Sequence, residues 1–130
     1  MKLRILDNSV RLRLGRSELR RLLQEGVVEG RVVFGPVATF SYALRLAAQA
    51  EPLRATLGDA RIDVVVNKEN AAEWAASDAV GIEVDQPTPA GGLRLLVEKD
   101  FPCQHIEMTE LPEKFTPATM SVLAEPRTGS

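Results

Sequence analysis

Residues 2–14 read KLRILDNSVRLRL, and apolar and charged side chains alternate along both halves of this stretch. A period of two is typical of half-buried β-strands. Asp7 and Asn8 lie between the halves, and both residue types tolerate the positive φ that a two-residue turn requires. The sequence therefore predicts a β-hairpin whose strands cover residues 2–6 and 9–14.

The rest of the chain continues as short strands and two helices, separated by glycine and proline turns. Ser17 and Asn67 are suitable N-caps for helices over residues 17–25 and 68–77, and Gly26 is suited to end the first helix. The remaining strands are expected over residues 27–34, 38–46, 53–57, 61–66, 79–85 and 93–101, with a loop, QPTPAGG, before the last of them.

This order, β-β-α-β-β-β-β-α-β-β, predicts an α+β fold. Because hairpins dominate, we expect a curved, mainly antiparallel sheet with both helices over one face, which partial closure could turn into a barrel. The two β-β-α-β-β halves have a similar layout, without a repeat at the level of residues. We expect residues 1–101 to form a single domain. Residues 102–130 are punctuated by prolines and are expected to form a tail partly packed on the body.

Composition places the chain among ordinary globular domains. It has 130 residues, 45% of them hydrophobic and 26% charged, which is enough to bury a core without disulfides or metals. Cys103 is the single cysteine, so no intramolecular disulfide can form and a reducing, cytoplasmic compartment is expected. No apolar run is long enough for a signal peptide or a membrane span.

Positive charge is concentrated near the start of the chain. Residues 1–21 hold seven basic and two acidic groups, whereas the remainder holds nine basic and sixteen acidic groups. In the predicted register Arg4 lies opposite Arg11 and Lys2 lies opposite Arg13, and like charges across a ladder need compensation. An anionic ligand is one compensator, because guanidinium groups suit phosphate and carboxylate oxygens. The alternative is ion pairing with acidic side chains on neighbouring strands, for which the candidates are Asp63, Glu83, Glu98 and Asp100.

A second candidate site follows the last strand. On an extended segment Cys103, His105 and Glu107 would point the same way, which could supply metal ligands or bring a thiol near an imidazole. Glu98 and Asp100 also share one side of their strand and could join such a metal site. The alternative is an ordinary cysteine, a surface histidine and a strand end that reaches water.

The common signatures of catalysis are missing from the sequence. It contains no GxGxxG or GxxxxGK[ST] phosphate loop, no GxSxG elbow and no HExxH motif. Aromatic residues make up only 5% of the chain, which is too few for a base-stacking platform, and Trp74 is expected to anchor the core. We therefore expect no cofactor.

Several stretches are similar to a family of small bacterial proteins that is known only as a domain of unknown function. They are the opening MKLRILDNSVRLRLGRSEL and the later segments FGPVATFSYALRL, EWAASDAVGIE and GGLRLLVEKDFPC, which together span about residues 1–103. The resemblance implies a shared fold and brings no activity, cofactor or catalytic residue.

The sequence favours a small cytoplasmic binding or interaction protein without enzymatic activity, whose partner is another protein or a second copy in a homodimer. One alternative is a protein or enzyme that binds a small anion or phosphate ester through Lys2, Arg4, Arg11 and Arg13. Another is a metal or redox site at Cys103 and His105. With a net charge of −2, neither nucleic acid nor a membrane is expected as a partner.

Overall fold

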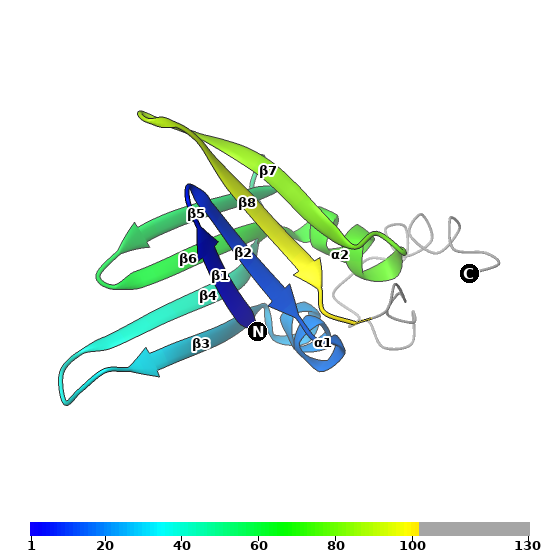
Figure 1. The fold of residues 1–130 in the computed structure, drawn as a ribbon. Helices are drawn as coiled ribbons and strands as arrows, with labels where there is room; N and C mark the ends of the chain where they lie inside the picture. Colours follow the sequence, from blue (N-terminus) through cyan, green and yellow to red (C-terminus); the bar gives the residue numbers. More distant parts are fainter. Residues whose placement is uncertain (102–130) are drawn as a thin grey trace.

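The computed structural model describes residues 1–101, and the predicted tail, residues 102–130, lies outside the described residues. The described elements follow the predicted order (Figure 1). They are β1 (Lys2–Leu6), β2 (Ser9–Leu14), α1 (Arg16–Glu25), β3 (Val27–Val33), β4 (Thr39–Ala47), β5 (Leu53–Gly58), β6 (Arg61–Asn67), α2 (Lys68–Ala76), β7 (Gly81–Thr88) and β8 (Gly91–Lys99).

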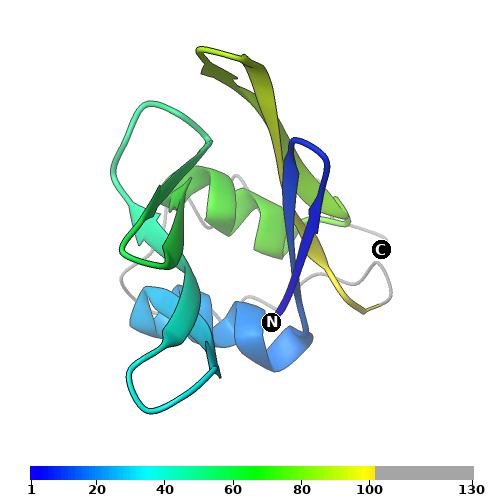
Figure 2. The same cartoon turned by 60° about the vertical axis from the view of Figure 1, so that its left-hand side comes forward.

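The strands form two four-stranded sheets, in the orders β1-β2-β8-β7 and β3-β4-β6-β5. Each sheet contains two antiparallel hairpins joined by one parallel pair, β2 with β8 and β4 with β6. The α+β class and the mainly antiparallel pairing are thus confirmed. The strands divide between two sheets because each helix carries the chain from one layer to the other, and among residues 1–101 no barrel closes. Figure 2 shows the two layers with both helices between them.

The two halves of the chain repeat one plan. β1 and β2 occupy the places in one sheet that β5 and β6 occupy in the other, and a helix follows each of these hairpins. The same offset in residue number separates Asp7 from Asp59, the two aspartates at hairpin turns with φ of 51° and 52°, and Gly15 from Asn67, the two N-caps. The duplicated layout suggested by the element order is therefore present in the structure, with the hairpins of the two halves exchanged between the sheets.

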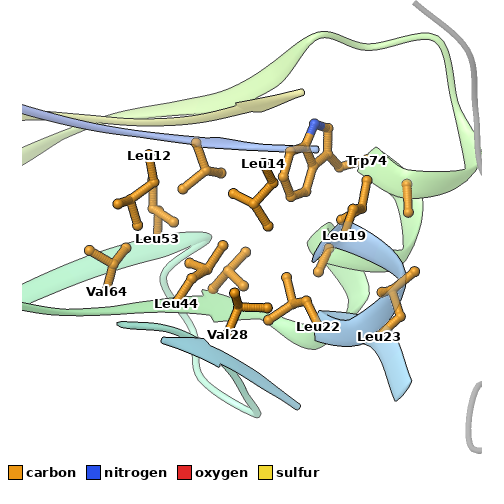
Figure 3. Close-up of a cluster of buried hydrophobic side chains, with 14 of the residues drawn as sticks. Leu12, Leu14, Leu19, Leu22, Leu23, Val28, Leu44, Leu53, Val64 and Trp74 are labelled. Carbon is orange, nitrogen blue, oxygen red and sulfur yellow. The ribbon is translucent and has the colours of Figure 1, made fainter. Parts of the chain in front are cut away.

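The core lies between the sheets and is closed at one end by the helices (Figure 3). Leu12 and Leu14 of β2 face Leu44 and Val64 of the other sheet, and all four are buried. Trp74 of α2 is buried beside them, as predicted, and its indole Nε1 donates to the Val80 carbonyl at 3.0 Å. Full burial of such a side chain stabilises the fold by about 1.5–3 kcal/mol.

The helix ends are set by local polar groups. Asn67 caps α2 as predicted, because its side chain accepts a hydrogen bond from the Asn70 amide at 3.0 Å. Gly26 ends α1 with φ of 88°, also as predicted. The cap of α1 is Gly15 rather than Ser17, because the Glu18 side chain reaches back to accept from the Gly15 amide at 2.9 Å.

The expected loop QPTPAGG is mostly strand. β7 continues to Thr88 and β8 begins at Gly91, so only a tight turn separates them. The Lys99 amide donates to the Val80 carbonyl, so the even-numbered residues of β7 use their main chain toward β8. Pro87 is odd-numbered, and its main chain therefore faces the free edge. Proline is tolerated there because no partner strand needs its missing N–H. The loop prediction was wrong because it treated this edge proline as a breaker.

No helix in residues 1–101 has the length and apolar character needed to cross a membrane.

Candidate interaction surface

The basic hairpin face forms in the predicted register, with Lys2 opposite Arg13 and Arg4 opposite Arg11. Parallel pairing of β2 with β8 brings acidic side chains alongside. Arg13 contacts Glu98 and Asp100, each at 3.1 Å. Lys2 reaches Asp100 at 2.9 Å, and Arg11 lies 3.6 Å from Glu98. Three of the four cations are therefore ion-paired within the sheet.

Asp100 keeps its negative charge in this network. The hydrogen bond from Lys2 holds the pKa of Asp100 below its ordinary value, and the nearby Arg13 acts in the same direction against a contribution from burial. Arg4 differs from its neighbours because its exposed side chain has no ion pair with any group in residues 1–101. It is the cation on this face that remains available to an external carboxylate.

Only some of the predicted metal ligands lie among the described residues. Cys103 and His105 lie outside the described residues. Glu98 and Asp100 point to the same side of β8, as predicted, but their oxygens are engaged by Arg13. In the described part of the chain no three His, Cys, Asp or Glu side chains gather as a metal site requires.

Exposed apolar side chains gather at the end of the molecule opposite the helices. All four hairpin turns lie at this end (Figure 1), and three of them carry large apolar residues. Phe34 is 73% exposed, Val37 98% and Leu57 75%. We call this region the open end, and its residues are Ile5, Leu6, Val32, Val33, Phe34, Val37 and Leu57. Soluble domains seldom concentrate so much apolar surface without using it.

Strand alternation explains why Ile5 and Leu57 are apolar. Ile5 follows Leu3, and Leu57 follows buried Ala55, each at the two-residue spacing that keeps side chains on one face of a strand. The inner faces of both sheets thus stay apolar beyond the part of the core that the helices close. At the open end no element of residues 1–101 covers them.

The two seams between edge strands of different sheets are built differently, and β5 and β7 contact each other more extensively than β1 and β3 do. Between β5 and β7, the Gln86 side-chain amide accepts from the Ala55 N–H at 2.8 Å and donates to the Ala55 carbonyl at 2.9 Å. Beside the seam between β1 and β3, the hydroxyl of Tyr42 on β4 donates to the carbonyl of Met1, the residue before β1, at 3.2 Å. The Tyr42 ring lies over Gly30, where a Cβ atom would come within 2.5 Å of it.

A family model covers all of these elements, matching residues 1–117. The chain belongs to DUF7009, described as a family of unknown function. No curated protein and no solved structure matches the chain. The resemblance to a domain of unknown function is thus confirmed, and an account of what this DUF7009 member does has to start from its geometry.

A pocket on the outer face of the second sheet is lined mainly by polar and charged side chains. It is lined by Glu29, Gly30, Arg31, Thr39, Ser41 and Arg61. Arg61 contacts Glu29 at 2.6 Å and donates to the Ser41 hydroxyl at 3.2 Å, so the polar groups satisfy one another. No imidazole or thiol is among these lining residues, and the one carboxylate, Glu29, is already ion-paired with Arg61.

Sequence reasoning missed both the open end and the seams. Phe34 and Leu57 have the alternation of core residues, and the pattern alone does not tell where two sheets stop covering each other. Gln86 was assigned to a loop. A glutamine at an inward-facing position of a strand is the signal that could have identified it, because a half-buried amide needs hydrogen-bond partners.

Proposed function

We propose that this DUF7009 member is a cytoplasmic, non-enzymatic interaction protein that binds another protein through its open end. The observation that carries the proposal is the set of apolar side chains exposed on three hairpins at the end of the fold away from the helices. Apolar and aromatic anchors surrounded by polar surface are typical of protein interfaces. The single cysteine supports a reducing compartment.

Burial of these residues would supply the binding energy. Phe34, Val37 and Leu57 are each more than two-thirds exposed. Moving a side chain of this size from water into an apolar contact is worth about 1.5–3 kcal/mol when burial is complete. A few such anchors dominate the affinity of most protein interfaces.

The basic hairpin face supports an anion site less well, because Glu98 and Asp100 already neutralise Lys2, Arg11 and Arg13. A phosphate group would have to compete with carboxylates that are already in place. Of the four cations on this face, only Arg4 has no ion pair with another described residue, and one guanidinium makes a weak phosphate site.

The test is a capture experiment in which wild type and two variants of the full chain are each used as bait for binding partners. Phe34→Ser/Val37→Ser/Leu57→Ser removes apolar surface from the open end, and Val80→Ser is the control, since Val80 is 48% exposed but lies just before β7, near the helices. We expect a partner that wild type and Val80→Ser retain and the triple variant loses. Calorimetry with that partner in purified form should reproduce the difference.

Sedimentation of the three proteins reports whether the partner is a second copy. Because all four positions are exposed, the variants should keep the thermal stability of wild type, which the same samples can verify. Partners retained equally by the triple variant would contradict the proposal, and so would a wild-type protein that stays monomeric and retains none.

A further inference from the structure

The free edge of β1 carries main-chain groups that have no partner within residues 1–101. The carbonyls of Asn8 and Leu14 accept from β8, so the even-numbered residues of β2 face β8 and the odd-numbered ones face β1. Because hydrogen-bonded pairs alternate along an antiparallel ladder, Lys2, Arg4 and Leu6 use their main chain toward β2. The N–H and C=O of Leu3 and Ile5 therefore point away from the sheet, and no group in residues 1–101 bonds to them there.

The second half of the chain shows how such an edge is satisfied. Ala55 of β5 lies opposite Val64, just as Leu3 of β1 lies opposite Leu12. The Gln86 side-chain amide bonds to the edge of β5 at Ala55, as a peptide group of a neighbouring strand would. When the strand registers of the two halves are aligned, Val32 on β3 stands at the position equivalent to Gln86 on β7. Valine has no group that can bond to Leu3, so the seam between β1 and β3 lacks the amide that closes the seam between β5 and β7.

The surroundings of this edge define what fits it. On its inner side lies the exposed side chain of Ile5. The register equivalence places Val32, also exposed, across the seam, and Val32 pairs with the partly buried Phe40. On the outer side of the edge lie Lys2 and Arg4. A strand added here would meet apolar surface on one face and positive charge on the other.

A second copy of β1 fits poorly. Antiparallel pairing of two β1 strands through Leu3 and Ile5 would centre on Arg4 and place it opposite its own copy. Like charges directly opposite one another are destabilising, and basic residues on edge strands are a common device against self-pairing. The charge pattern selects an acidic partner instead.

We propose that an extended segment of a partner protein, with apolar and acidic side chains alternating, adds to the free edge of β1 in the seam between β1 and β3. This rests on the proposed function, since it names the partner chemistry recognised beside the open end. Main-chain bonds to Leu3 and Ile5 supply the pairing. Apolar side chains enter beside Val32, and acidic ones lie near Arg4.

The probes are short, blocked peptides that alternate valine with glutamate or valine with lysine, titrated into the full chain. We expect the glutamate peptide to bind at least about tenfold more tightly than the lysine peptide. Arg4→Glu should reverse that order. In amide hydrogen exchange followed by NMR, the bound glutamate peptide should slow the exchange of the Leu3 and Ile5 amides.

Two N-methylated forms of the glutamate peptide identify strand addition. One is methylated on every valine nitrogen and the other on every glutamate nitrogen, and only one of these sets faces β1. Loss of binding with methylated valine indicates antiparallel addition, and loss with methylated glutamate indicates parallel addition.

Absence of binding by the glutamate peptide, equal behaviour of the two methylated forms, or unchanged Leu3 and Ile5 amides would overturn the strand-addition proposal. If the partner found by capture still depends on Phe34, Val37 and Leu57, the proposed function stands and this refinement alone fails. If capture also shows no such dependence, both fail.

Discussion

The seam between β5 and β7 and the seam between β1 and β3 occupy equivalent places in a duplicated fold, yet only the first is closed by a peptide-like group. Gln86 bonds to both main-chain groups of Ala55, whereas Val32 leaves Leu3 without a partner among the described residues. Duplication supplies two similar edges, and a single side chain decides which of them stays available. The first is a structural contact, and the second is a candidate recognition site.

The largest effect is expected at Gly30, where the open seam is most tightly packed. Gly30→Ala places a Cβ 2.5 Å from the Tyr42 ring, so the ring must move and the hydroxyl loses the Met1 carbonyl. Urea denaturation should show a loss of about 1–3 kcal/mol in the free energy of unfolding. In a Tyr42→Leu background the same change should cost much less, and an equal cost in both backgrounds would contradict this packing.

A comparable but smaller effect is expected at the closed seam. Gln86→Leu leaves the Ala55 N–H and C=O without the amide, which should lower the free energy of unfolding by about 1–2 kcal/mol. The Ala55 amide should exchange its hydrogen faster in the variant. Unchanged protection of Ala55 would mean that Gln86 does not close this seam.

The start of β1 is held by an ion pair whose strength depends on pH. The Met1 ammonium, which is buried, contacts Glu18. Burial raises the pKa of Glu18, but the hydrogen bonds from that ammonium and from the Gly15 amide outweigh it, so the pKa lies below its ordinary value of 4.5. A lowered folded-state pKa stabilises the fold above the ordinary value, and that contribution disappears as pH falls through the folded-state pKa.

Glu18→Gln should therefore lower the free energy of unfolding at neutral pH by about 1 kcal/mol. The difference from wild type should shrink as the pH is taken below 4.5. Parallel urea titrations across that range measure it. A difference that is independent of pH would indicate that the ion pair does not anchor β1.

The smallest change in stability is expected for Val32→Gln, which copies the closed seam onto the open one. Val32 is 45% exposed, so the substitution buries no new polar group and should shift the free energy of unfolding by no more than about 0.5 kcal/mol. It should nevertheless protect the Leu3 amide and weaken binding of the valine–glutamate peptide. Undiminished peptide binding would show that the Leu3 edge is not used.

Local patterns predicted much of the fold. The alternation in residues 2–14 and the turn at Asp7 fixed the first hairpin and its register, because both depend on neighbouring residues. Asn67 and Gly26 marked helix ends for the same reason. The face shared by Glu98 and Asp100 also follows from alternation, and this is why their pairing with basic residues could be named in advance as an alternative to anion binding.

The missing features depend on residues far apart in the sequence. Nothing near Arg13 shows that β8 pairs with β2 in parallel and places Glu98 beside it. One seam is closed because Gln86 of one sheet bonds to Ala55 of the other. The other seam lacks such a bond because Val32 occupies the position equivalent to Gln86. The exposure of Phe34 depends on where the sheets cease to cover each other, which no local period encodes.

Amide hydrogen exchange of the unliganded full chain, resolved by NMR, tests the difference between the seams most directly. We expect the Ala55 amide to be protected, whereas the amide of Leu3, at the equivalent edge position on β1, and that of Ile5, the next edge residue, should exchange rapidly. Protection of Leu3 and Ile5 comparable to that of Ala55 would contradict it, because the edge of β1 would then be already occupied.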